Sequence, residues 1–185
     1  LVRDLFTDWR QRPASLSIRR IAGPPVAPAP DLSRLAEASA GILAQIAPYW
    51  LNYFNRFVYS RPANTIGQPR VRPGGRGLSA SGHFALAADE GLMITLDPLQ
   101  SGSVGIQVTD PWGVAYDYVT RMSSLNLAQA RPNPDGSYTF VIAARDPGVY
   151  NWLDTEGYSA GMLAIRWQAA PADADPGRAI RGVSV

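Results

Sequence analysis

The sequence predicts a mainly β protein, namely an antiparallel, jelly-roll-like β-sandwich preceded by an α-helical N-terminal segment. Two observations carry this prediction. Apolar side chains recur at helical spacing before residue 80, and from Ser81 onward they alternate with a period of two. Clusters of Asp, Pro and Gly separate the short alternating runs, which is typical of antiparallel sandwiches. With 185 residues, 46% of them hydrophobic, the chain is long enough to bury one core.

Residues 1–60 are predicted to form the helical segment. A first helix over residues 1–12 carries large apolar side chains on one face, and prolines keep residues 12–30 extended. Asp31 fits the N-cap of a second helix, whose apolar face ends in four aromatic residues. These are Trp50, Tyr53, Phe54 and Phe57. We expect Pro48 to kink or split this helix, and we expect the aromatic face to cover the sandwich or a partner, because so much apolar surface is unfavourable in water.

The β part is predicted over residues 81–168, between a connector rich in Gly, Pro and Arg (61–80) and a polar C-terminal extension (169–185). The turn at Asp89–Gly91 predicts a hairpin between the first two strands. Nine side chains on the inward face of the strands are predicted to form the core. They are Phe84, Leu86, Ile94, Ile106, Val108, Phe140, Ile142, Ile165 and Trp167.

Composition excludes several chemistries. All 17 basic residues are Arg, so neither a Schiff-base lysine nor a P-loop lysine is present. The absence of Cys excludes thiol catalysis, disulfides and Cys-ligated metals, and a single histidine, His83, excludes a multi-His site. Carboxylates alone could still hold a hard cation, but no ligand set for one is predicted. We therefore expect no cofactor and no metal.

Charge and hydropathy also limit the partners. The net charge of +2 is too small to indicate nucleic acid, and no apolar run is long enough to span a membrane. The chain begins at Leu1 rather than Met, so we interpret it as part of a longer protein. The compartment is left open, with the cytoplasm slightly favoured.

Five stretches of the chain occur in the order in which they appear in one bacterial family. They are Gly82–Leu92, Tyr118–Ala130, Asp135–Gly136, Asp146–Thr155 and Arg166–Trp167. The sharpest motif among them is Asn151-Trp152-Leu153. In these stretches the chain resembles the bacterial domain of unknown function numbered twelve-fourteen. The resemblance covers residues 80–168 and implies a jelly-roll-like sandwich within a longer chain. It implies no established activity, so it assigns no catalytic residue.

The candidate ligand-binding residues come from two polar segments, 118–129 and 146–157, which we expect to lie side by side at one end of the sandwich. They are Arg121, Asn126, Asn151, Trp152 and Asp154. Arginine, amides and a large ring together suit recognition of a small polar ligand. Each also has a structural interpretation: Asp154 in a turn, Asn151 bonded to the loop backbone, Trp152 closing the end of the sandwich, and Arg121 in an ion pair with Asp117 or Asp146.

Two functions stay open. The first is a non-catalytic module that binds a ligand, or docks on the rest of its own longer chain or on another protein subunit. The second is a hydrolase- or lyase-type enzyme that uses carboxylates and Arg at one end of the sandwich. An enzyme should gather Asp146, Asp154 and Arg121 around one concave pocket, with His83 as an optional fourth member. A non-catalytic role is favoured for His83. The aromatic helix favours the first function.

Overall fold

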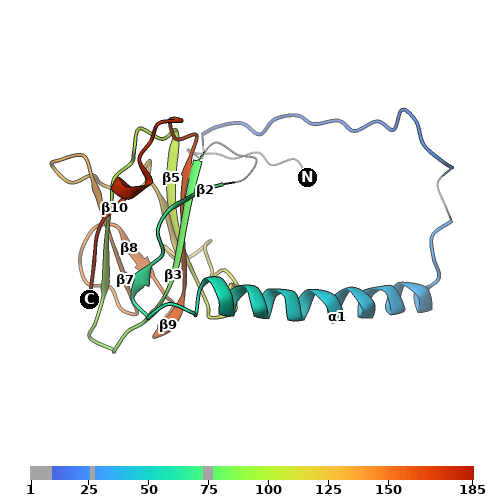
Figure 1. Cartoon of the computed structure of the whole chain (residues 1–185), viewed down its shortest axis with the longest axis horizontal. Helices are drawn as coiled ribbons and strands as arrows, with labels where there is room; N and C mark the ends of the chain where they lie inside the picture. Colours follow the sequence, from blue (N-terminus) through green and yellow to red (C-terminus); the bar gives the residue numbers. More distant parts are fainter. Residues whose placement is uncertain (1–9, 26–27, 73–76) are drawn as a thin grey trace. The chain divides into compact units, whose positions relative to one another are not determined.

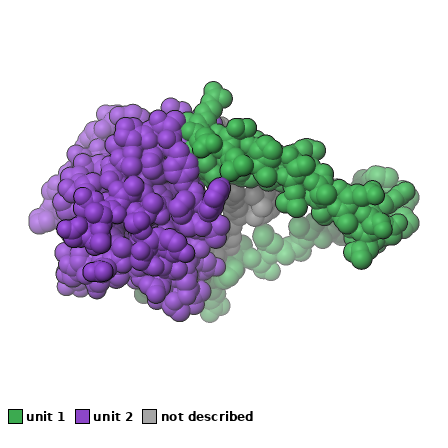
Figure 2. Space-filling model, turned by 90° about the horizontal axis from the view of Figure 1, so that it is seen from below, with its two compact units in different colours: residues 1–56 green, residues 57–185 purple. Residues whose placement is uncertain are grey.

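The computed structural model describes residues 10–25, 28–72 and 77–185. The chain divides into two units, residues 1–56 and residues 57–185 (Figure 2). The first unit holds nearly all of helix α1 (Leu32–Phe57), and the second holds every described strand (Figure 1). Most of the helix predicted over residues 1–12 lies outside the described residues. None of the described helices is long and apolar enough to cross a membrane.

Helix α1 begins where the sequence predicts. The backbone N–H of Arg34 donates to Asp31 Oδ1 at 2.9 Å, so Asp31 is the N-cap. The helix continues through Pro48, so Pro48 does not split it, and a kink at this position stays a prediction. A proline removes only one backbone donor, and the hydrogen bonds on either side keep the helix continuous. No residue of α1 is buried, so packing of its apolar face on the sandwich or on a partner stays a prediction.

Residues 57–185 form a β-sandwich of two sheets. The first sheet has the order β1 (Thr65–Ile66), β3 (Gly77–Ala85), β9 (Ala160–Gln168), β5 (Ser103–Thr109), β6 (Ser124–Asn126), and β2 (Arg70–Val71) also pairs with β3. The second has the order β10 (Ile180–Ser184), β4 (Leu92–Leu96), β7 (Tyr138–Ala143), β8 (Trp152–Asp154). All of these strand pairs are antiparallel except β7–β8, which is parallel.

One hydrophobic core lies between the sheets. All nine predicted core residues are buried, and Trp167, Phe84 and Phe140 are the largest fully buried side chains. Side chains alternate along β4 between buried and exposed or half-buried positions, as the period of two predicts. The predicted fold class, a mainly β sandwich preceded by a helix, is confirmed.

Two local predictions differ from the structure. The turn at Asp89–Gly91 does not close a hairpin, because β3 pairs with β9 whereas β4 pairs with β7 in the other sheet. A turn reverses the chain but does not decide which sheet the next strand joins. The segments expected to be a connector and an extension also contribute strands: β1, β2 and the start of β3 lie before residue 81, and β10 lies after residue 168. These strands are short, or begin among Gly and Arg residues, so their alternation is weak.

Candidate functional site

The two segments predicted to lie side by side are in contact. The backbone N–H of Asp154 donates to the Met122 carbonyl at 2.9 Å, and Arg121 Nη1 lies 2.9 Å from Asp154 Oδ2. The rings of Tyr116 and Tyr158 stack nearby, with centroids 5.5 Å apart. Arg121 therefore pairs with Asp154 and not with Asp117 or Asp146, so the predicted adjacency is confirmed and the predicted ion-pair partners are not.

Asn151 acts as a clamp on the backbone. Its φ of 60° lies in the left-handed region, which Asn tolerates better than most residues. Its Oδ1 accepts from the Arg131 N–H at 2.7 Å, and its Nδ2 donates to the carbonyls of Arg131 and Thr139 at 2.8 and 2.9 Å. The predicted bonding of Asn151 to loop backbone is confirmed, and both of its amide N–H donors are used.

The other three candidates also have structural partners. Asn126 Oδ1 accepts from the backbone of Ala128 and Gln129, which closes the turn after β6. Trp152 lies on β8 and is only half-buried, and its Nε1 donates to the Ala143 carbonyl at 3.0 Å, so its ring is not fully enclosed by the sandwich. Asp154 is buried, and its Oδ1 accepts from the Glu156 N–H at 2.8 Å in the predicted turn.

Of the two carboxylates proposed for acid–base work, Asp154 pairs with Arg121, whereas no contact is seen between Asp146 and Arg121 among the described residues. Asp146 is exposed and closes its own turn, accepting from the Gly148 N–H at 2.8 Å. Tyr116 is buried, its hydroxyl has no hydrogen-bond partner among the described residues, and burial raises its pKa. A phenol with a raised pKa stays neutral at physiological pH, so Tyr116 does not supply a base. The ring of His83 packs against Tyr59, with centroids 5.0 Å apart.

Replacing Asn151 by glycine tests the clamp. Glycine accepts the left-handed backbone, so any loss of stability reports on the side-chain hydrogen bonds. Three bonds with a net contribution of about 0.5–1.5 kcal/mol each predict a loss of roughly 2 kcal/mol in the free energy of unfolding. Urea denaturation followed by circular dichroism measures it. Asn126→Ala, which removes two bonds at a residue without a positive φ, should lose less; an equal loss would contradict the clamp.

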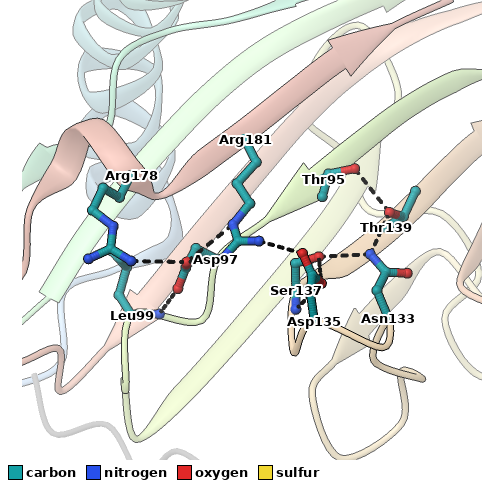
Figure 3. A network of polar contacts seen from close by, with 9 residues as sticks. All are labelled: Thr95, Asp97, Leu99, Asn133, Asp135, Ser137, Thr139, Arg178 and Arg181. Atoms are coloured by element: carbon teal, nitrogen blue, oxygen red, sulfur yellow. Dashed lines mark hydrogen bonds and ion pairs between the residues drawn. The ribbon is translucent and has the colours of Figure 1, made fainter.

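A second polar site, which the sequence analysis missed, surrounds Asp97. A hollow of about 410 Å³ lies between the end of β4, the turn before β7 and residues 171–181. In Figure 3, Asp97 lies between the guanidinium groups of Arg178 and Arg181, and Arg181 lies between Asp97 and Asp135. The hollow therefore joins segments far apart in the chain.

Asp97 forms hydrogen bonds to three other residues of this part of the fold through its carboxylate and its backbone carbonyl. Its Oδ1 accepts from the Leu99 N–H at 2.9 Å, and its Oδ2 accepts from Nε and Nη2 of Arg181 at 3.2 and 2.7 Å. Its backbone carbonyl accepts from the indole N–H of Trp167 at 2.8 Å. Burial raises the pKa of Asp97, but the Leu99 N–H and the nearby Arg181 and Arg178 outweigh burial and hold the pKa below its usual value.

Arg181 bridges two carboxylates. Its Nη1 donates to Asp135 Oδ2 at 2.6 Å, while its other nitrogens bind Asp97. Asp135 Oδ1 in turn accepts from the hydroxyl and the backbone N–H of Ser137, and with Arg181 these bonds lower the pKa of Asp135. The network ties strand β10 to the turn before β7 and to the end of β4. Among the described residues, no group of three or more His, Asp or Glu is placed to hold a metal ion.

Comparison with known proteins gives one structural neighbour of interest. No family model matches the chain, and no curated protein matches it. Two chains of solved structures match. One comes from the crystal structure of an uncharacterised protein from Burkholderia cenocepacia, with 32% sequence identity over 60% of this chain and a TM-score of 0.55. This chain spans 33% of the length of that protein, and the similarity supports the sandwich fold without indicating an activity.

Proposed function

We propose that this chain is a non-catalytic β-sandwich module of a longer bacterial protein and that helix α1 docks it on a second subunit. The observation that supports docking is the exposed apolar face of α1. We also propose that the chain belongs to the domain of unknown function numbered twelve-fourteen. The two-sheet fold and the backbone role of Asn151 in the Asn-Trp-Leu motif support that assignment.

Most of the large apolar residues of α1 fall on one side of the helix. Leu35, Ile42, Ile46, Tyr49, Trp50, Tyr53 and Phe57 follow one another at spacings of one, three, four or seven residues, and all are exposed. At its C-terminal half the rings contact one another: Trp50 lies 5.5 Å from Tyr53 and 5.7 Å from Phe54 between centroids. The other side carries mostly polar and small residues, among them Asn52 and Asn55, together with Leu51.

This helix needs a partner surface to be stable. An interior proline destabilises a helix by about 3 kcal/mol and a glycine by about 1 kcal/mol relative to alanine, and α1 contains both Pro48 and Gly41. Most helical stability in proteins comes from packing of an apolar face. Large aromatic side chains can bury about 150–250 Å² each, so the stripe on two copies of the chain can reach the roughly 1,000 Å² of a specific interface.

The charge on α1 does not oppose pairing of two copies. Its charged side chains are Arg34, Glu37 and Arg56; Glu37 lies on the side opposite the apolar stripe, and Arg56, seven residues after Tyr49 and three after Tyr53, lies at the edge of the stripe. A second copy of this chain is therefore the partner that we propose for the docking face.

The alternative, a hydrolase- or lyase-type enzyme, has weaker support. Among the described residues, the charges that pair in the two candidate segments are Arg121 and Asp154, and these neutralise each other. The amides beside them are engaged by backbone. A turnover that is abolished by Asp154→Asn in a stably folded protein would favour the enzyme instead.

Substitutions on the two sides of α1 test docking. We expect the chain to associate, and we expect Trp50→Ser combined with Phe54→Ser to return it to the monomer mass in light scattering after size exclusion. The matched control, Asn52→Ser combined with Asn55→Ser on the polar side, should leave association unchanged.

Hydrogen exchange separates the remaining outcomes. If the wild-type chain is monomeric and the α1 amides exchange as in an unfolded peptide, α1 is not a docking helix. If it is monomeric and the amides are protected, α1 covers its own sandwich, and docking on a second subunit is excluded.

A further inference from the structure

We propose that the hollow beside Asp97 binds a small zwitterion, with the carboxylate of the ligand on Arg178 and its ammonium group beside Asp173 and Asp175. All three side chains line the hollow. Its volume of about 410 Å³ falls within the range of about 300–1,000 Å³ typical of small-molecule sites. This inference is independent of the docking function of α1.

Two carboxylates of the hollow, Asp97 and Asp135, already share one guanidinium, that of Arg181. Asp97 is buried, and Arg181 engages both Asp97 and Asp135 through three short contacts of 2.6–3.2 Å. A guanidinium that is shared between two carboxylates has little attraction left for an anion. Figure 3 shows this bridge, with Arg178 on the other side of Asp97. Arg181 therefore holds the site together and is not its recognition group.

Arg178 is the cation that remains for a ligand. Its Nη2 lies 3.9 Å from Asp97 Oδ2, which is too long for a hydrogen bond, and its side chain is 70% exposed. The planar guanidinium presents paired N–H donors that match the two oxygens of a carboxylate. Because Asp97 is already occupied by Arg181, an incoming carboxylate competes only with the long contact to Asp97.

Asp173 and Asp175 supply the opposite charge from the same loop. Within the described residues, Asp173 has neither a hydrogen bond nor an ion pair. Asp175 uses Oδ1 to cap the short 3-10 helix η1 (Pro176–Arg178), accepting from the Gly177 N–H at 2.8 Å. The lining holds four Asp and two Arg, a formal charge of −4 + 2 = −2. Once the bridge of Arg181 is set aside, two carboxylates face one guanidinium, and a molecule carrying both charges fits that pattern better than an ion of one sign.

The rim opposite this loop is held by a tight turn. Leu99 and Gln100 have φ angles of 50° and 52°, both in the left-handed region, and the Ser101 N–H donates to the Pro98 carbonyl at 2.9 Å. Such a conformation is uncommon for a residue other than glycine and needs support from its surroundings. Asp97 Oδ1 on the Leu99 N–H and the burial of Leu99 in the core provide that support. The turn places the polar side chain of Gln100 on the wall of the hollow.

Calorimetric titration with simple probes tests the proposal. We use 4-aminobutanoate and 6-aminohexanoate as zwitterions of two lengths, with butanoate, hexanoate and butylamine as probes of one charge. We expect at least one zwitterion to bind tenfold or more tightly than every single-charge probe. Equal binding of the carboxylates would make the hollow an anion site, equal binding of butylamine would make it a cation site, and no binding would leave it without a ligand; each of these results overturns the proposal.

Two variants and two controls locate the binding. Arg178→Gln and Asp173→Asn should each weaken zwitterion binding at least tenfold, because each removes one of the two recognised charges. Arg145→Gln and Asp146→Asn change the same residue types at exposed positions outside the hollow and should leave binding unchanged. Thermal unfolding checks that the variants fold, and both mutated side chains are exposed. Binding that survives both variants would place the probe elsewhere.

Discussion

Replacing Trp167 by alanine is expected to lower the free energy of unfolding by about 3–5 kcal/mol, as for other core aromatics. Trp167 is fully buried on β9, the strand that pairs with both β3 and β5 in the first sheet. Its indole N–H also donates to the Asp97 carbonyl at 2.8 Å. The alanine variant therefore leaves a cavity and also leaves a buried carbonyl without its donor.

Trp112 and Trp152 give a graded control for this result. Trp112 is 68% exposed, so Trp112→Ala should change the free energy of unfolding by less than about 0.5 kcal/mol. Trp152 is half-buried, so Trp152→Ala should fall between the other two. Urea denaturation of the three variants under the same conditions measures the order. A loss for Trp152→Ala as large as that for Trp167→Ala would mean that the sandwich depends on a ring that is more tightly packed than its half-burial indicates.

The core could be predicted from the sequence because the alternation of apolar and other residues recurs in several runs of the chain. Phe84, Ile106 and Ile165 each lie in a run where every second residue is apolar, and only one register of those runs buries them all. The pairing of the strands carries no such signal. The parallel pairing of β7 with β8, and the passage of the chain from one sheet to the other after β3, depend on contacts between distant strands.

The role of the candidate site residues could not be predicted from the sequence either. The Asn-Trp-Leu motif indicated Asn151 as a candidate ligand-binding residue. The polar side-chain atoms of Asn151 do form well-defined hydrogen bonds, but their partners are backbone groups of the chain itself. A residue type that is good at binding a ligand is equally good at binding a loop. Only the partners of its atoms separate the two roles.

The Asp97 hollow could not be found from the sequence because its residues look ordinary there. Asp97 precedes a proline and Asp135 precedes a glycine, and both dipeptides are common in turns. Arg178 and Arg181 lie in a segment without strong alternation, which was interpreted as an extension. Their role in the hollow depends on the pairing of β10 with β4, which brings Arg181 beside Asp97.

Replacing Asp97 by alanine is expected to lower the free energy of unfolding at pH 7 by about 3 kcal/mol. The change removes charge-assisted hydrogen bonds, each worth about 1.5–3 kcal/mol when well formed, and it leaves a backbone N–H without its acceptor. Partial exposure of Arg181 reduces the contribution of the ion pair. Asp97→Asn should lose less, because the amide oxygen can still accept from the Leu99 N–H. A loss of equal size in the two variants would show that the charge carries the whole effect.

The pH dependence of Asp97→Asn isolates that charge. The pKa of Asp97 in the folded protein lies below its usual value, so the carboxylate stabilises the fold at neutral pH. This stabilisation is complete above the pKa of an unfolded Asp, about 3.9, and it is lost as the pH falls through the lower, folded-state pKa.

Asparagine cannot titrate, so the difference in the free energy of unfolding between wild type and Asp97→Asn should be constant from pH 7 to about pH 5 and should narrow below about pH 4. Urea denaturation at a series of pH values measures this difference. A difference that widened in acid would mean that Asp97 is more easily protonated in the folded protein than in the unfolded chain, and the bonds from Arg181 and Leu99 would then not outweigh its burial.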